Sequence, residues 1–168
     1  MGDVKDLSNK EAIAKLKELA EGVGTCMFCT ELNKTPFATR PMGLQEVDED
    51  GDLWFISSAQ SNKNDEIKQD DKVQLIFAQP SNAHFLSVYG EASIYKDKNK
   101  IDEVWNPLAK AWFKEGKDDP NVTVIRVKPI ESYYWDTKDG RLFSLIKIAT
   151  AAITGKVMDG GIEGTIDV

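Results

Sequence analysis

The sequence predicts a mainly β protein, a closed or partly closed antiparallel barrel with short helices between its strands. Three observations lead to this fold class. Short segments rich in β-branched and aromatic residues follow one another along the chain, turn residues join them as hairpins, and helical periodicity is confined to a few short stretches. With 168 residues and no linker, the chain is expected to form a single domain over 1–168 with one continuous core.

Three helical regions are expected. Ser8 followed by Glu11 matches a capping box, and apolar residues then recur at helical spacing until Gly22, which predicts an N-terminal helix within 1–23. A short capped helix is expected over 61–67. Residues 97–113 again show helical spacing, and Pro107 divides them into two short helices.

The strand-like segments are residues 25–32, 37–47, 53–57, 73–78, 85–95, 122–127 and 132–135. The acidic residues 48–52 between the second and third segments are typical of a hairpin turn. Gly90 inside a long strand indicates a bulge or bend. Residues 143–153 fit a strand or a helix, and the Gly-, Thr- and Asp-rich residues 154–168 are expected to form an irregular tail.

Composition and charge argue against several function classes. Lys and Arg number 21 against 28 Asp and Glu, and the net charge of −7 would repel nucleic acids and anionic membranes. The N-terminus lacks the basic and apolar regions of a secretory signal, and no apolar run approaches the roughly 20 residues that span a bilayer. We therefore expect a cytoplasmic protein that binds neither nucleic acid nor membrane.

Both cysteines, Cys26 and Cys29, lie in one strand-like segment and match the C-x-x-C pattern. On a strand, an offset of three sends the side chains to opposite faces, with Cα atoms roughly 10 Å apart, which exceeds disulfide reach. His84 is the only histidine, so a zinc ion would lack ligands. We expect structural thiols and no metal site, and we assign no catalytic residue.

Basic residues occur where acidic ones are missing. Residues 32–45 contain Arg40 and residues 53–64 contain Lys63, yet neither stretch has an Asp or Glu. If the two stretches pair as a hairpin, Arg40 approaches the hydroxyl-rich segment that leads into the short helix. Hydroxyls, free helix N–H groups and two cations then make a phosphate pocket, whose members are Arg40, Ser57, Ser58, Ser61 and Lys63. Alternatively, Ser61 only caps the helix while the two cations are solvated.

Short motifs along the chain form an ordered set that resembles one protein family. They are Arg40-Pro41-Met42, Asp50-Gly51-Asp52-Leu53-Trp54-Phe55, Ser61 with Lys63, Val88-Tyr89-Gly90-Glu91-Ala92, Trp105-Asn106-Pro107, Trp112-Phe113, Gly116-Lys117-Asp118-Asp119-Pro120 and Tyr134-Trp135-Asp136. Together they resemble the general stress protein branch of the pyridoxamine-5′-phosphate-oxidase-like, FMN-binding split-barrel superfamily. The likeness runs in order from residue 10 to residue 147.

The resemblance implies a six-stranded antiparallel split β-barrel and a homodimer, with FMN in a site shared at the subunit interface. FAD is the alternative cofactor. The implied flavin-binding residues are Arg40, Pro41 and Met42 beside the ring and phosphate, Phe55, Ile56, Ser57 and Ser58 through backbone and hydroxyl groups, and Ser61 and Lys63 at the phosphate. Trp112 and Trp135 are further candidates, from either subunit, although tryptophans at such spacings also fit a core or an interface.

The resemblance suggests two functions. One is a flavin-dependent oxidoreductase of unknown substrate, in which the flavin carries the redox chemistry. The other is a non-catalytic stress protein that buffers or senses flavin, and a third reading is a binding protein that has lost the flavin. The namesake enzymes resemble one another in a C-terminal Arg-x-His substrate motif, whereas no histidine follows His84 here. We therefore do not expect efficient oxidation of pyridoxamine phosphate.

Overall fold

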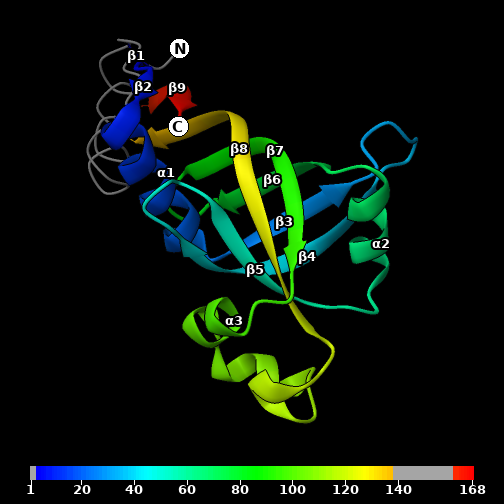
Figure 1. Ribbon diagram of the computed structural model, residues 1–168. Helices are drawn as coiled ribbons and strands as arrows, with labels where there is room; N and C mark the ends of the chain where they lie inside the picture. Colours follow the sequence, from blue (N-terminus) through cyan, green and yellow to red (C-terminus); the bar gives the residue numbers. More distant parts are fainter. Residues whose placement is uncertain (1–2, 138–160) are drawn as a thin grey trace.

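The computed structural model describes residues 3–137 and 161–168, and its central feature is a closed antiparallel barrel of six strands (Figure 1). The strands are β3 (Thr25–Thr30), β4 (Ala38–Val47), β5 (Leu53–Ser58), β6 (Lys72–Gln79), β7 (His84–Tyr95) and β8 (Val122–Thr137). Around the barrel they pair in the order β8, β5, β4, β3, β6, β7, and β7 returns to β8. This architecture confirms the predicted six-stranded barrel.

β8 differs from the prediction, because it is one strand of 16 residues where two were expected. The residues that were expected to separate the two include Pro129, which has no N–H to donate to a strand partner. The strand continues because the register shifts at this point. Gly90 lies opposite Pro129. Its neighbour Tyr89 lies opposite Glu131, so Ile130 is the extra residue of a bulge, which confirms the irregularity predicted at Gly90.

Part of the predicted irregular tail is also a strand. β9 (Gly161–Asp167) pairs antiparallel with the second half of β8 and parallel with β1 (Asp3–Val4) and β2 (Leu7–Ser8). The prediction was wrong for 161–167 because pairing with distant strands overrides the weak local preference. Gly164 permits the close crossing, since a Cβ there would lie 2.1 Å from the carbonyl oxygen of Lys5. Residues 143–153 and 154–160, for which predictions were also made, lie outside the described residues.

The N-terminal helix α1 (Asn9–Val23) packs against β4, β7 and β9 near both ends of the chain (Figure 1). Ser8 is its N-cap residue, but the predicted capping box is absent because the Ser8 side chain makes no capping hydrogen bond. The helix ends at Val23, one residue beyond the predicted stop at Gly22, because its C-cap residue Gly24 has the left-handed conformation that terminates helices, with φ of 74°. Its buried residues are Ala12, Leu16, Leu19 and Ala20.

The remaining helices are short. They are α2 (Asn62–Gln69), α3 (Lys98–Val104) and the 3-10 helices η1 (Pro107–Ala111) and η2 (Gly116–Asp118). The division predicted at Pro107 is confirmed, since α3 ends at Val104 and η1 begins at Pro107. Among the helices in the described part of the chain, none has the length and apolar character needed to cross a bilayer.

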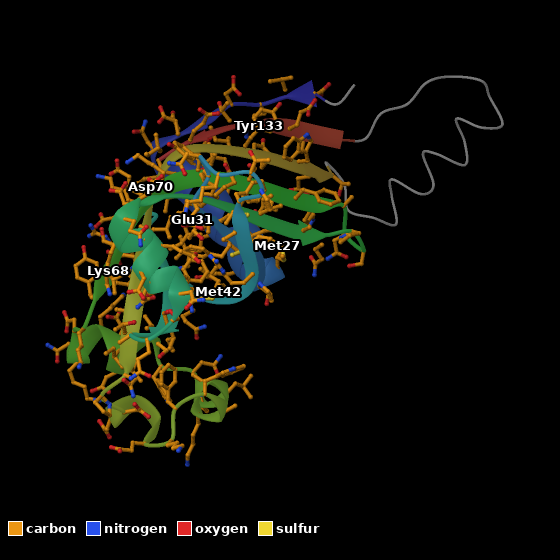
Figure 2. All side chains as sticks on the ribbon, turned by 90° about the vertical axis from the view of Figure 1, so that its right-hand side faces the viewer. Met27, Glu31, Met42, Lys68, Asp70 and Tyr133 are labelled. Atoms are coloured by element: carbon orange, nitrogen blue, oxygen red, sulfur yellow. The ribbon has the colours of Figure 1, made fainter. Side chains whose placement is uncertain are left out.

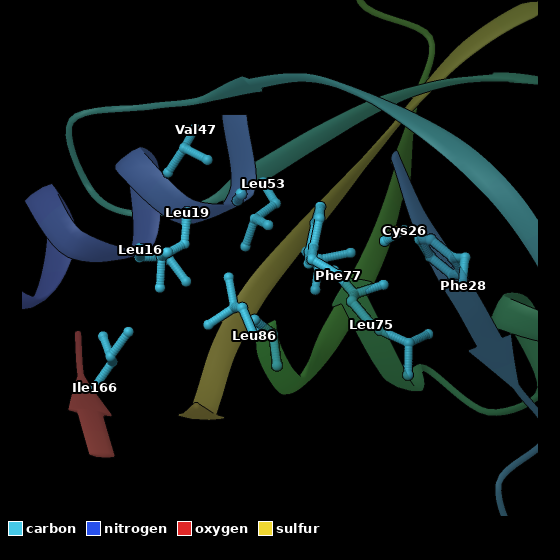
Figure 3. Close-up of a cluster of buried hydrophobic side chains, with 14 of the residues drawn as sticks. Leu16, Leu19, Cys26, Phe28, Val47, Leu53, Leu75, Phe77, Leu86 and Ile166 are labelled. Atoms are coloured by element: carbon cyan, nitrogen blue, oxygen red, sulfur yellow. The ribbon is translucent and has the colours of Figure 1, made fainter. Parts of the chain in front are cut away.

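Two apolar clusters hold these elements together. The larger one fills the barrel (Figure 3), and within it the rings of Phe28 and Phe55 meet edge to face with centroids 5.3 Å apart. The smaller cluster lies on the opposite face of β5 and β8 and consists of Ile101, Val104, Ala109, Phe113, Val122 and Val124. Neighbouring residues of a strand point to opposite faces, so Ile56 packs on this second cluster while Phe55 packs in the barrel. The second cluster therefore holds α3 and η1 beside β5.

We predict that Gly90→Ala lowers the free energy of unfolding by about 1–3 kcal/mol, because overpacking distorts the β7–β8 pairing. A Cβ at Gly90 would lie 2.4 Å from the carbonyl oxygen of Lys128. The measurement is urea unfolding followed by circular dichroism. Gly22→Ala is the control, since nothing lies within 4 Å of a Cβ there, and it should be neutral or stabilise α1 by up to about 1 kcal/mol. Equal effects of the two substitutions would contradict the assigned bulge.

Candidate functional site

A cleft of about 620 Å³ opens where β4 and β5 diverge. The two strands pair only between Leu44 and Val47 on β4, and Leu44 lies opposite Phe55. Beyond this pair, β4 remains paired with β3, and β5 remains paired with β8. Residues 40–43 of β4 therefore separate from residues 56–58 of β5. The volume lies within the range of about 300–1,000 Å³ typical of small-molecule sites. The predicted hairpin is confirmed near its turn, but it opens towards the cleft.

Residues from five parts of the chain line this cleft. They are Gly24 and Thr25 at the start of β3, Arg40, Pro41, Met42, Gly43, Leu44 and Gln45 on β4, Ile56, Ser57 and Ser58 on β5, Lys63 on α2, and Asn106, Leu108, Ala109, Trp112 and Phe113 around η1. Figure 2 labels Met42 on β4 and Lys68 on α2 for orientation. The η1 side is unusual, because Leu108 is 75% exposed and Trp112 is 78% exposed although both are large and apolar.

Three of the residues implied by the family resemblance do not line the cleft. Phe55 is fully buried in the barrel because it faces inward on β5. Ser61 is the N-cap residue of α2, and its hydroxyl donates to Asn64 Oδ1 at 3.2 Å. Trp135 lies on the second half of β8, where its ring centroid is 4.8 Å from that of Tyr133. The implied residues that do meet at the cleft are Arg40, Pro41, Met42, Ile56, Ser57, Ser58, Lys63 and Trp112.

A buried hydrogen-bond network fixes the start of α2 against the barrel. Ser57 Oγ donates to Asn64 Oδ1 at 2.7 Å, and Asn64 Nδ2 donates to Thr123 Oγ1 at 3.1 Å. Thr123 Oγ1 in turn donates to the carbonyl oxygen of Ser57 at 2.9 Å. These three side chains are buried, so the bonds are shielded from water. The network places Lys63, the residue before Asn64, at the cleft.

One end of the cleft carries two cations in different environments. Arg40 Nη2 donates to Glu66 Oε2 at 2.7 Å, and Nη1 donates to Thr30 Oγ1 at 2.6 Å. Lys63 has no hydrogen-bond or ion-pair partner among the residues that the structure describes. Burial, followed by the nearby Arg40 guanidinium, lowers the pKa of Lys63, and the Glu66 carboxylate opposes this shift. A partly buried cation of this kind is stabilised when an anion binds beside it.

Sequence reasoning missed Thr30, Asn64 and Glu66, which organise the cationic end. Lys63 and Glu66 are three residues apart on a predicted helix, and this spacing places their side chains on one face. Glu66 was therefore within reach of a sequence argument. Thr30 and Asn64 act through contacts with distant strands, which no local pattern indicates.

The two free cysteines are both buried and lie on β3. Cys26 packs in the barrel core, whereas Cys29 lies on the other side of β3, 3.3 Å from Thr39 Oγ1. Burial raises the pKa of the Cys26 thiol to about 12, so it stays protonated and unreactive at neutral pH. Within residues 3–137 and 161–168, no group of three His, Cys, Asp or Glu side chains is arranged to hold a metal ion. His84 Nε2 lies 3.0 Å from Asp136 Oδ1.

The cleft as a whole fits a ligand with a flat apolar part and one anionic end. Leu44, Ile56, Leu108 and Phe113 offer apolar surface for the flat part, together with Met42 and Trp112. Lys63, Ser58 and Arg40 line the part of the cleft where the anionic end of such a ligand would lie. Small molecules with an aromatic ring system at one end and a phosphate at the other have this form.

Comparisons of sequence place this chain among known relatives. It matches the family described as Pyridoxamine 5'-phosphate oxidase like over residues 11–159. Protein bli-3 of Neurospora crassa is 32% identical over 140 residues, which cover 77% of this chain and 67% of that protein. General stress protein 26 of Bacillus subtilis is 26% identical over 80 residues, which cover 46% of this chain and 56% of that protein.

Solved structures agree with these relatives. A structure from Jannaschia sp. CCS1 assigned to general stress protein 26 shares the fold, with a TM-score of 0.77 at 23% identity over 94% of this chain and 96% of that chain. The general stress FMN/FAD binding protein of Xanthomonas citri gives a TM-score of 0.64 at 25% identity, over 76% and 90% of the two chains. Because the family match spans most of the sequence, the chain belongs to the pyridoxamine 5'-phosphate oxidase-like family.

Proposed function

We propose that the chain is a cytoplasmic flavin-binding protein that holds FMN in the cleft between β4 and β5. The observation that carries the proposal is Lys63, a partly buried cation at the cleft whose pKa is lowered by burial. The name of the Xanthomonas citri relative, an FMN/FAD binding protein, supports the same cofactor class. When bound, the flavin would supply hydride or electron transfer, while the chain binds and orients it.

In this proposal each part of the cleft has a separate role. Lys63 and Arg40 neutralise the phosphate, and the Ser58 hydroxyl supplies a hydrogen bond. Met42 excludes water from the ring on the barrel side, and Ile56 does so on the side of the second apolar cluster. Trp112 is positioned to cover the ring from the η1 side, which would explain why so large an apolar side chain is exposed.

We further propose a homodimer whose interface borders the cleft. Outward-facing apolar side chains form a patch across β3, β6, β7 and β8, with exposed fractions of 42% for Met27, 45% for Ile76, 36% for Phe85 and 42% for Trp135. Met27 pairs with Ile76 on one side and with Pro41, a cleft residue, on the other. Met27 and Tyr133 are labelled in Figure 2. A patch of this kind is typical of a protein interface, and a second copy seated there would reach the cleft.

Two functions remain for a flavin held in this way. A flavin-dependent oxidoreductase would oxidise NAD(P)H or reduce a dye faster than free FMN does, whereas a protein that buffers or senses flavin would not. Both use the same cleft and the same phosphate contacts. Turnover assays at equal total FMN, with and without the protein, separate them.

We predict that Lys63→Ala weakens FMN binding by about 1.5–3 kcal/mol, roughly 10- to 150-fold, because one charge-assisted phosphate contact is lost. Riboflavin, which has no phosphate, should bind almost unchanged. Flavin fluorescence titration measures both affinities. Lys68→Ala is the matched control on the same helix, since Lys68 is exposed and pairs with Asp65. Equal weakening of FMN and riboflavin would contradict the phosphate assignment.

We predict that Ile76→Glu converts a dimer into a monomer, because it places a charge in the centre of the apolar patch. Light scattering at micromolar concentration gives the mass, and circular dichroism checks the fold. Val4→Glu is the control, since Val4 is 65% exposed on β1 outside the patch and should leave the dimer intact. A wild-type protein that is strictly monomeric with flavin bound would contradict the shared interface.

We also predict that the FMN-loaded protein does not efficiently oxidise pyridoxamine phosphate. Oxidation requires a second phosphate clamp that holds the substrate against the flavin. The cleft has one cationic end among the described residues, and FMN would occupy it. The measurement follows the absorbance of pyridoxal phosphate in the presence of oxygen, and turnover comparable to that of a true oxidase would show the prediction wrong.

A further inference from the structure

Glu66 places a negative charge directly against the cationic end of the cleft. Its carboxylate oxygen Oε2 accepts hydrogen bonds from Arg40 Nη2 at 2.7 Å and from Thr30 Oγ1 at 2.5 Å. The side chains of Glu66 and Arg40 are only 16% and 24% exposed, and Thr30 is fully buried. The contact is therefore shielded from solvent, unlike an ordinary surface ion pair.

The pairing changes the charge that a phosphate would meet. Arg40 and Lys63 contribute two positive charges and Glu66 contributes one negative charge, which leaves a net charge of one. A phosphate monoester near pH 7 carries a charge of about −1.5 to −2. Glu66 also affects Lys63, since its carboxylate raises the pKa of Lys63, which burial and, to a smaller extent, Arg40 lower. The three side chains therefore act as one electrostatic unit.

We propose that Glu66 is a positioning and affinity-limiting residue of the phosphate end, which holds Arg40 in place and keeps the bound flavin exchangeable. Thr30 completes the positioning, because its hydroxyl accepts from Arg40 and donates to Glu66. An exchangeable flavin suits a protein that takes up and releases flavin, or uses it as a cosubstrate, more than one with a permanent cofactor. This inference rests on the proposed binding of FMN in the cleft.

The variant Glu66→Gln separates charge from position. Its amide oxygen still accepts from Arg40, but the negative charge is gone. We expect FMN to bind roughly five- to tenfold more tightly, because one repulsive charge near the phosphate is removed. We expect FMN to dissociate correspondingly more slowly, while riboflavin affinity changes less than about twofold. Stopped-flow fluorescence with both flavins measures affinity and release.

Two further variants control the experiment. Asp65→Asn removes the same charge from the preceding residue of α2, which is 63% exposed and pairs with Lys68, so FMN binding should change little. Glu66→Met removes the charge and the hydrogen-bond acceptor together on a side chain of similar length, so FMN should bind less tightly to it than to Glu66→Gln, because Arg40 is no longer held. If Glu66→Gln does not fold, Glu66→Met takes its place, and FMN binding no tighter than that of the wild type would then overturn the proposal.

The outcomes distinguish this inference from the proposed function. Unchanged or weaker FMN binding by Glu66→Gln, with the wild type still binding FMN, overturns the role of Glu66 alone. A wild type that does not bind FMN overturns the proposed function. In that case titration with inorganic phosphate, followed by tryptophan fluorescence, decides the inference, because Glu66→Gln should still bind phosphate more tightly. Equal phosphate affinities of the two proteins would overturn it.

Discussion

The separation of β4 from β5 is the constraint on which the site depends. Each strand keeps a different partner beyond Leu44 and Phe55, so the barrel wall opens although the barrel as a whole is closed. Asn64 stabilises the opening, because it bonds to β5 through Ser57 and to β8 through Thr123. An open wall without this network would leave buried polar groups unpaired, which costs stability. The cleft is thus a consequence of how the barrel closes.

β8 connects this cleft to the rest of the molecule. Its first half completes the barrel beside β5, while its second half carries β9 and, through it, β1 and β2 (Figure 1). The bulge at Ile130 lets one strand serve both purposes, and Gly90 gives the room that the bulge needs. On the outer face of β8, Val122 and Val124 pack against α3 and η1. β8 therefore supports β5 and η1, two of the parts that line the cleft.

The electrostatics of the cleft show how two cations close in space can differ in role. Arg40 is already paired, so its charge is largely balanced and its geometry is held by Thr30 and Glu66. Lys63 is partly buried without such a partner in the described part of the chain, and its lowered pKa reflects that cost. In the proposed function, the favourable energy of phosphate binding would come chiefly from Lys63, because its desolvation is uncompensated. The chain as a whole carries a net charge of −7, so the cationic end of the cleft differs in charge from the protein overall.

Much of the fold and the cationic part of the site were determined by the sequence itself, because strand alternation, turn residues and helix signals are local. They placed Arg40 and Lys63 near one another, since both flank the hairpin whose acidic turn is 48–52. Only the tertiary structure decided which faces of those strands meet the cleft. Phe55 turns into the barrel, Trp135 lies along β8, and Glu66 binds Arg40, because each orientation depends on contacts between residues distant in sequence. The continuous β8 and the strand β9 were missed for the same reason: pairing with distant strands outweighs local preference.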